Sequence, residues 1–295
     1  MKMAGFMDMH LDDIKIIGVV GGGTMGNGIA HVCSQGGYDV ILVDTSNEIL
    51  EKAKKTITVN LDRMIKKEKI TEQDKNNTLN RIYFGTKLDD LREAQLIVEA
   101  IYENLEAKIA VFKQLDMICT NGAILASNTS SLPITQLAAT TRRAERVIGM
   151  HFMNPVPMMS LVELIRGIAT SDETFHLTQE LSRRLGKTPV EVNDFPGFIS
   201  NRILMPMINE AIYALMEGVA SAEDIDTVMK LGMNHPMGPL TLADFIGLDV
   251  CLAIMEVLYK GFSDSKYRPC PLLWKMVQAG YLGRKTGRGF FIYEK

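Results

Sequence analysis

The chain has 295 residues, of which 46% are hydrophobic and 23% are charged, and its formal net charge at pH 7 is −3. This length predicts about two domains, the composition is typical of a globular protein, and the slight acidity argues against a nucleic-acid partner. No apolar run approaches the roughly 20 residues of a membrane-spanning helix. The segment before Ile14 is acidic and unlike a targeting peptide. We therefore expect a cytoplasmic protein without a membrane partner, with a short extension ahead of its first strand.

The first two thirds of the chain alternate between strand-like and helix-like segments. Such alternation predicts parallel strands joined by crossover helices, and hence an α/β domain with a doubly wound, Rossmann-like, mainly parallel sheet. We expect strands at 14–20, 39–43, 81–84, 96–100, 123–126, 147–151, 158–165 and 188–192, and helices at 24–36, 47–69, 104–117 and 131–139. Because the helical segment from Glu48 is long for a crossover, a protruding helical hairpin is predicted over about 47–80.

The pattern becomes helical after Asp194. Pro196-Gly197 interrupts the chain, so we divide it into domains 1–193 and 194–295, the second of them all-α. Pro206 should kink the first of its helices or end a turn of it. The helices are expected at 198–217, 221–231, 240–258 and 270–279, followed by a turn and a short apolar segment within 283–293.

A glycine-rich turn follows the first predicted strand. Gly21, Gly23 and Gly26 form the pattern G-x-G-x-x-G, in which the first glycine permits the turn, the second lets a pyrophosphate approach and the third lets the helix pack closely. The helix that opens near Thr24 and Met25 would point N–H groups at the phosphates. The pattern indicates a bound dinucleotide, with a plain tight turn as the alternative.

Asp44 ends the second predicted strand, about 20 residues after the turn. Its carboxylate could accept a hydrogen bond from a ribose 2′-OH and would repel a 2′-phosphate. The following residues, 45–47, include no arginine for such a phosphate. The sequence therefore favours NAD over NADP as cofactor.

A base for alcohol oxidation is sought among the five histidines, because histidine titrates close to neutral pH. His151 closes an apolar strand, and ligands of open α/β sheets bind at the carboxyl ends of strands. His31 is expected to be a packing residue. Glu163 interrupts another apolar run, and a buried carboxylate needs a partner, so it could orient the His151 imidazole. The alternatives are a structural histidine and an edge-strand glutamate that faces water.

Three further polar features each allow a structural and a functional interpretation. The loop 127–133 either caps the next helix or presents hydroxyls and an amide to cofactor and substrate. Asn201, in the first turn of a predicted helix, could reach toward a site, although an exposed helix residue is the simpler interpretation. Arg63, Lys66 and Lys67 share one helix face, which could hold phosphates of an acyl carrier or be merely solvated. The four cysteines have no metal-binding spacing and no histidine cluster beside them, so neither a metal site nor a disulfide is expected.

At this point the residues resemble the L-3-hydroxyacyl-CoA dehydrogenase family, over essentially the whole chain after about residue 14. Gly22, where the family usually has alanine, and the extra N-terminal residues are minor departures. The tail from Asn234 is most similar to bacterial members that act on 3-hydroxybutyryl-CoA. The matching segments are Gly21–Gly26, LIVEAIYENLEAK (96–108), ILASNTSSLPIT (124–135), GMHFMNPVPMMSLVELI (149–165), DFPGFISNRIL (194–204), NHPMGPLTLADFIGLDV (234–250) and GRKTGRGFF (283–291).

The resemblance implies roles for individual residues. His151 would be the catalytic histidine and Glu163 its partner, with Ser130 and Asn201 near the substrate carbonyl. It implies NAD contacts at Asp44, Glu103, Lys108 and Asn128, and CoA contacts, matched loosely, at Arg63 and Lys67. The substrate would be acetoacetyl-CoA or 3-hydroxybutyryl-CoA, and the helical domain would form a homodimer.

Two rival functions stay open at this point. One is a related enzyme that acts on a free hydroxy acid or a longer acyl-CoA, although the basic hairpin favours CoA. The other is a non-catalytic NAD-binding protein on the same scaffold. The presence of both His151 and Glu163 argues against the second, because a structural role would not require the pair.

Overall fold

The structure, a computed structural model, describes residues 10–294 and separates after Asp194 into two compact units, which are treated one at a time. Most of the predicted N-terminal extension, residues 1–9, lies outside the described residues. Its remainder includes a short 3-10 helix over Leu11–Asp13.

The first unit is built on an eight-stranded sheet with the order β3-β2-β1-β4-β5-β6-β7-β8. All neighbouring strands are parallel except β6 and β7, which are antiparallel. The central strands are buried along their whole length, which agrees with their nearly unbroken apolar sequences. This confirms the predicted Rossmann-like, mainly parallel sheet. The strands are β1 (Ile16–Val20), β2 (Asp39–Val43), β3 (Ile82–Gly85), β4 (Leu96–Glu99), β5 (Ile124–Ser127), β6 (Val147–Phe152), β7 (Leu161–Arg166) and β8 (Thr188–Asn193).

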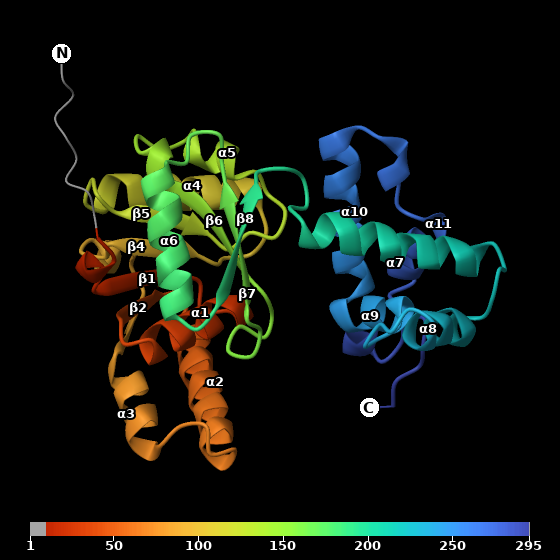
Figure 1. Ribbon diagram of the computed structural model, residues 1–295, viewed down its shortest axis with the longest axis horizontal. Helices are drawn as coiled ribbons and strands as arrows, with labels where there is room; N and C mark the ends of the chain where they lie inside the picture. Colours follow the sequence, from red (N-terminus) through yellow and green to blue (C-terminus); the bar gives the residue numbers. More distant parts are fainter. Residues whose placement is uncertain (1–9, 295) are drawn as a thin grey trace. The chain divides into compact units, whose positions relative to one another are not determined.

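Helices cover both faces of this sheet (Figure 1). On one face α1 (Thr24–Gln35) and α6 (Asp172–Arg184) pack on the strands through an apolar core. On the other face lie α4 (Leu105–Ile118) and α5 (Ile134–Ala138). The sheet is thus sandwiched, and the carboxyl ends of its parallel strands meet at one edge.

Two expected elements begin later than predicted. Strand β7 starts at Leu161 rather than at 158, because the N–H groups of Met158 and Met159 both donate to the Pro155 carbonyl at 3.0 Å and form a turn. Helix α5 starts at Ile134 rather than at 131. In both cases side-chain and turn hydrogen bonds hold the preceding residues in a loop.

The segment after β2 forms a helical hairpin that projects from the sheet, as Figure 1 shows in orange. Its arms are α2 (Asn47–Lys66) and α3 (Glu72–Asn80). The second arm begins with a capping box, in which the Thr71 hydroxyl accepts from the Asp74 N–H and the Asp74 carboxylate accepts from the Thr71 N–H. The hairpin extends the first unit beyond its sheet.

The second unit is helical and has its own apolar core. Helix α7 contains Pro206 in its interior, as the sequence predicted. The prediction of a single helix over 240–258 is wrong, because Gly247 separates α9 from α10. The φ of Gly247 is 106°, a conformation that other residues rarely adopt. The helices are α7 (Ser200–Met216), α8 (Ala222–Leu231), α9 (Pro239–Ile246), α10 (Leu248–Phe262) and α11 (Pro271–Gln278).

Candidate active site

The glycine turn joins β1 to α1 and has the geometry of a phosphate cradle. Gly21 has φ of 102°, and a Cβ there would lie 2.6 Å from the Ala100 carbonyl oxygen. A Cβ on Gly26 would lie within bonding distance of the Gly21 carbonyl oxygen, so only glycine allows α1 to start so close to the strand. Gly23 faces open space, with nothing within 4 Å of its Cβ position. Gly23 immediately precedes α1, where the N–H groups of the first helical turn, including those of Thr24 and Met25, have no partner within the helix.

Asp44 lies directly after β2, beside this turn. Its Oδ2 accepts a hydrogen bond from the Gly22 N–H at 2.7 Å. A cavity of about 550 Å³ opens here, and it is lined by Asp44, the glycine turn and mainly apolar residues after β4 and on α4. An apolar cavity with one carboxylate at its rim fits an adenosine, because the ring can be buried while the ribose hydroxyls reach the acid.

His151 and Glu163 lie opposite each other on the antiparallel strands β6 and β7. The distance between Nδ1 of His151 and Oε2 of Glu163 is 2.8 Å, and both side chains are buried. The alternative of a glutamate facing water is therefore wrong: Glu163 is 2% exposed. A carboxylate at Nδ1 fixes the ring orientation and leaves Nε2 as the nitrogen that can exchange a proton with a substrate.

The loop after β5 is organised by Glu103. The Oε1 atom of this residue accepts from the Thr129 hydroxyl at 2.6 Å, the Ser130 N–H at 3.0 Å, and the Ser130 and Ser131 hydroxyls at 3.3 and 3.2 Å. Asn128 links this loop to the histidine strand, because its Oδ1 accepts from the Phe152 N–H at 2.9 Å. The structure thus brings Glu103, Asn128 and Ser130 together at the carboxyl ends of β4, β5 and β6.

Lys108 lies on α4, and its side chain extends toward Glu99 and Glu103 and is only 1% exposed. Its ammonium donates to Glu99 Oε1 at 2.7 Å and lies 3.4 Å from Glu103 Oε2. Glu99, fully buried at the end of β4, is a site residue that the sequence reasoning missed. The sequence does show a glutamate at the end of an apolar strand, about ten residues before a lysine. Only the fold shows that both side chains are buried.

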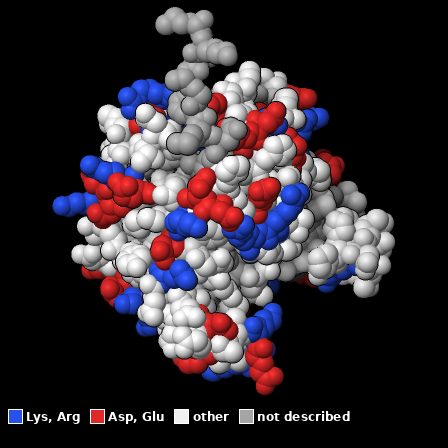
Figure 2. Space-filling view, turned by 60° about the vertical axis from the view of Figure 1, so that its left-hand side comes forward, with Lys and Arg blue, Asp and Glu red and all other residues white. Residues whose placement is uncertain are grey.

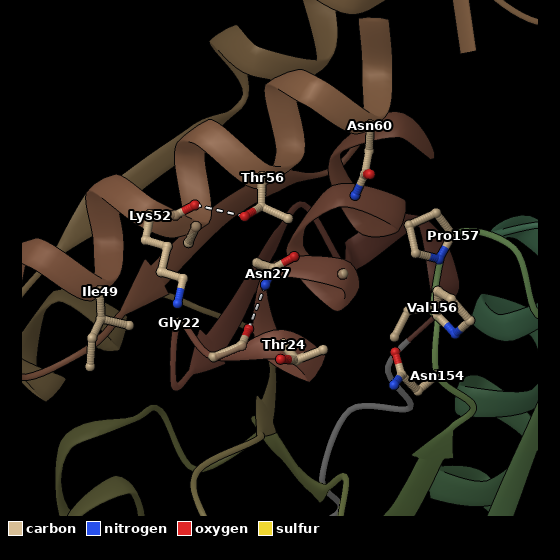
Figure 3. Close-up of a pocket in the computed structure, with 14 residues that line it drawn as sticks. Gly22, Thr24, Asn27, Ile49, Lys52, Thr56, Asn60, Asn154, Val156 and Pro157 are labelled. Atoms are coloured by element: carbon tan, nitrogen blue, oxygen red, sulfur yellow. Dashed lines mark hydrogen bonds between the residues drawn. The ribbon is translucent and has the colours of Figure 1, made fainter. Parts of the chain in front are cut away.

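A second cavity, of about 400 Å³, lies between the glycine turn, α2 and the loop that follows β6 (Figure 3). Figure 3 shows Lys52, Thr56 and Asn60 on α2 along one side, and Asn154, Val156 and Pro157 on the other. The sequence analysis gave these lining residues no role: those on α2 lie outside every matching segment, and those after β6 lie within the segment 149–165 without being singled out.

Lys187 holds the loop that follows β6. Its ammonium donates to the carbonyls of Val156 and Met159 at 2.6 and 2.8 Å. Burial lowers the pKa of this lysine. The cavity wall is therefore tied to the start of β8 rather than being a loose loop.

The remaining predicted residues lie elsewhere. Arg63 is exposed in the last turn of α2, and Lys67 is exposed at its end, at the tip of the hairpin. Asn201 lies in the first turn of α7 and is buried, not exposed, but it belongs to the second unit. The catalytic and binding roles of all these residues stay predictions.

The sequence was compared with known families. A family model described as the NAD binding domain of 3-hydroxyacyl-CoA dehydrogenase matches residues 16–195, and one described as the C-terminal domain of the same enzyme matches residues 197–293. The chain belongs to the 3-hydroxyacyl-CoA dehydrogenase family. NAD as cofactor agrees with the glycine cradle and with Asp44, and the predicted family is confirmed.

Individual relatives of the family are similar over nearly their whole length. A probable 3-hydroxybutyryl-CoA dehydrogenase of Bacillus subtilis is 58% identical, over 96% of this chain and 99% of its own. A 3-hydroxybutyryl-CoA dehydrogenase of Bradyrhizobium diazoefficiens is 57% identical, over 95% and 96%. The crystal structure of (S)-3-hydroxybutyryl-CoA dehydrogenase PaaH1 from Ralstonia eutropha has a TM-score of 0.94 and 56% identity, and the match covers 96% of this chain and 100% of that one.

Three further properties concern membrane spans, metal sites and surface charge. Between residues 10 and 294, no helix has both the length and the hydropathy needed to cross a bilayer. Within the same range, no cluster of three or more His, Cys, Asp or Glu side chains could hold a metal ion. On the face shown in Figure 2, basic and acidic side chains are intermingled, unlike the one-sided basic surface of nucleic-acid-binding proteins.

Proposed function

We propose that this family member interconverts (S)-3-hydroxybutyryl-CoA and acetoacetyl-CoA with NAD(H). The single observation that carries the chemistry is the buried His151–Glu163 pair, with Nδ1 and Oε2 2.8 Å apart. The short-chain substrate is supported by the names of the relatives that are 58% and 57% identical to the chain.

In the oxidation, Nε2 of His151 takes the proton of the 3-hydroxyl group, because Nδ1 is engaged by Glu163. The carboxylate of Glu163 stabilises the imidazolium that results. NAD, which the glycine turn and Asp44 would hold, would supply the acceptor for the hydride that leaves C3 of the substrate. In the reduction, His151 returns the proton to the carbonyl oxygen.

The substrate oxygen is positioned by Ser130 and Asn201 in this proposal. The Ser130 hydroxyl is held near Glu103 Oε1 at 3.3 Å, on the loop that Asn128 ties to β6. Asn201 belongs to the other unit, and its role is supported by the family resemblance alone.

We assign the CoA moiety to the cavity between α2 and the loop after β6, with its phosphates toward Arg63 and Lys67. The cavity starts at the glycine turn and extends along α2 from Lys52 as far as Asn60. Arg63 and Lys67 are exposed at the end of the same helix, and cations of this kind form charge-assisted hydrogen bonds with phosphates.

The second unit is proposed to form a homodimer. It exposes large apolar side chains that its own core does not cover, and where such side chains form a contiguous patch they commonly mark a protein contact. They are Ile203 at 67% exposure, Val219 at 72%, Val228 at 60%, Leu231 at 83% and Phe245 at 57%. Sedimentation of the purified chain tests this, and a monomer at micromolar concentration would refute it.

The activity is tested by NADH oxidation with acetoacetyl-CoA, measured in parallel with NADPH. We expect turnover with NADH and a strong preference for it. A series of 3-ketoacyl-CoA esters, together with free acetoacetate, separates the short-chain assignment from a longer-chain or free-acid enzyme. Absence of turnover with every ester would refute the proposal and favour a non-catalytic NAD-binding protein.

A further inference from the structure

Beneath the loop that bears Ser130, three charged side chains form a continuous chain of contacts: Glu99, Lys108 and Glu103. Glu99 Oε1 is 2.7 Å from the Lys108 ammonium, which is 3.4 Å from Glu103 Oε2. The side chains of Glu99 and Lys108 are 0% and 1% exposed, whereas that of Glu103 is 38% exposed. The chain of contacts therefore runs from the centre of the sheet to the surface of the site.

Glu99 is fixed from three sides. Its Oε1 also accepts from the Ile101 N–H at 2.8 Å, and its Oε2 accepts from the Ser127 hydroxyl at 2.6 Å. Its backbone carbonyl accepts from the Asn128 N–H at 2.8 Å. Every oxygen of this residue therefore accepts at least one hydrogen bond, and these contacts hold the carboxylate in place beside the lysine.

The two oxygens of Glu103 have separate partners. Oε2 faces Lys108, and Oε1 accepts the hydrogen bonds of Thr129, Ser130 and Ser131. Any movement of this carboxylate toward the lysine must therefore lengthen the hydrogen bonds that hold the loop. The Lys108 ammonium lies closer to Glu99, at 2.7 Å, than to Glu103, at 3.4 Å, and it also donates to the Ile101 carbonyl at 3.4 Å.

We propose that Glu99 is a positioning residue for the reaction: by holding Lys108 it sets the carboxylate of Glu103, and thereby the place of Ser130. The inference rests on the proposed function, in which Ser130 meets the substrate oxygen. Without the Glu99 charge, the buried ammonium keeps Glu103 as its anionic partner among the described residues and draws it in, since an unpaired buried charge is strongly unfavourable.

The test is Glu99→Gln, which keeps the size of the side chain, removes its charge and replaces one of its two accepting oxygens by an NH2 donor. We expect kcat at saturating NADH to fall at least about 10-fold, because misplacement of a reacting group by a fraction of an ångström is costly. In a Lys108→Met background the same substitution should cost less than about 2-fold, since it acts through the lysine. Equal costs in both backgrounds, or an unchanged kcat, would overturn the proposal.

A matched control separates positioning from general stability. Asp116 and Arg143 form another buried pair in the same unit, 2.8 Å apart, with side chains 6% and 5% exposed. Asp116 lies near the end of α4, whereas Lys108 lies in its first turns, and Asp116→Asn breaks that pair. We expect Asp116→Asn to lower the melting temperature as much as Glu99→Gln does, with kcat unchanged.

Two further measurements keep the inference decidable. If Glu99→Gln does not fold, Glu99→Asp retains the charge but withdraws the carboxylate by one methylene, and an unchanged kcat there counts against the proposal. A crystal structure of a folded Glu99 variant should place Glu103 Oε1 beyond hydrogen-bond distance of the Ser130 N–H; retention of that bond contradicts the proposal. This readout needs no activity, so an inactive wild-type enzyme would refute the proposed function without deciding the role of Glu99.

Discussion

Glu163 faces His151 across the antiparallel strand pair β6 and β7, in direct register, so that a carboxylate oxygen lies 2.8 Å from Nδ1. Side chains opposite each other in such a pair point to the same face of the sheet, and both are buried here. The register of β6 and β7 therefore holds the imidazole in one orientation.

Replacement of the proposed base tests this arrangement. We expect His151→Ala to lower kcat by about 10²- to 10⁴-fold, because the proton acceptor is lost, with little change in NADH binding measured by fluorescence titration. His176, exposed on α6, provides the control, and His176→Ala should retain normal kcat. A His151→Ala enzyme with near-normal kcat would refute the assignment.

Loss of the partner's charge tests the role of Glu163 separately. Glu163→Gln preserves the shape of the side chain but removes the anion that, in the proposed mechanism, stabilises the imidazolium. We expect kcat to fall by about 10²-fold or more, as for other histidine bases that lose a carboxylate partner, while KM for NADH stays unchanged. A Glu163→Gln enzyme as fast as the wild type would mean that Glu163 only fills space.

Cofactor choice is assigned to Asp44. Asp44→Ala removes the repulsion of a 2′-phosphate and a hydrogen-bond acceptor for the ribose. The ratio of kcat/KM for NADH to that for NADPH should therefore fall at least about 10-fold. Asp39, at the other end of β2, is the control, and Asp39→Ala should leave the ratio as it is. A wild-type enzyme that prefers NADPH would contradict the role of Asp44 outright.

The basic end of the hairpin is tested with two substrates. In an Arg63→Ala, Lys67→Ala double variant, KM for acetoacetyl-CoA should rise several-fold, since two exposed phosphate contacts are each worth up to about 1 kcal/mol. KM for acetoacetyl-pantetheine, which lacks the nucleotide phosphates, should stay the same. An equal rise for both substrates would show that the effect does not come from phosphate binding.

Another histidine affects stability rather than catalysis. His31 on α1 is fully buried, and among the described residues neither of its ring nitrogens has a hydrogen-bond partner. Burial, with a smaller contribution from the charge of Lys187, lowers its pKa from 6.5 to about 4. As the pH falls below 6.5, the unfolded chain therefore takes up a proton that the folded chain does not, and the free energy of unfolding decreases.

Urea unfolding at pH 7 and pH 5 checks this linkage. Relative to a His31→Leu variant, the wild type should lose about 2 kcal/mol of unfolding free energy between these two values. A substitution of the exposed His176 by leucine should leave the pH dependence of the wild type intact. Parallel curves for wild type and His31→Leu would mean that the folded chain protonates His31 freely.

Much of the fold is readable from local patterns. Each of these patterns lies within one strand–helix–strand segment: the alternation of apolar strands and helices, the glycine turn and the acid after β2. The structure confirms the predicted sheet. Prediction was wrong where a single residue overrides a hydrophobic pattern. At Gly247 a positive φ divides a continuous apolar stretch into two helices, and the turn after Pro155 shortens β7.

Residue type and spacing along short stretches of chain were enough to predict the fold class and a dinucleotide-binding turn, and the resemblance of longer segments indicated the family. They could not show which polar side chains are buried or which of them meet, because such contacts join residues from separate elements. The pairing of His151 with Glu163 depends on strand register, and that of Glu99 with Lys108 on how α4 packs against the end of β4. Burial makes such pairs obligatory, since a charge removed from water must find its partner within the fold.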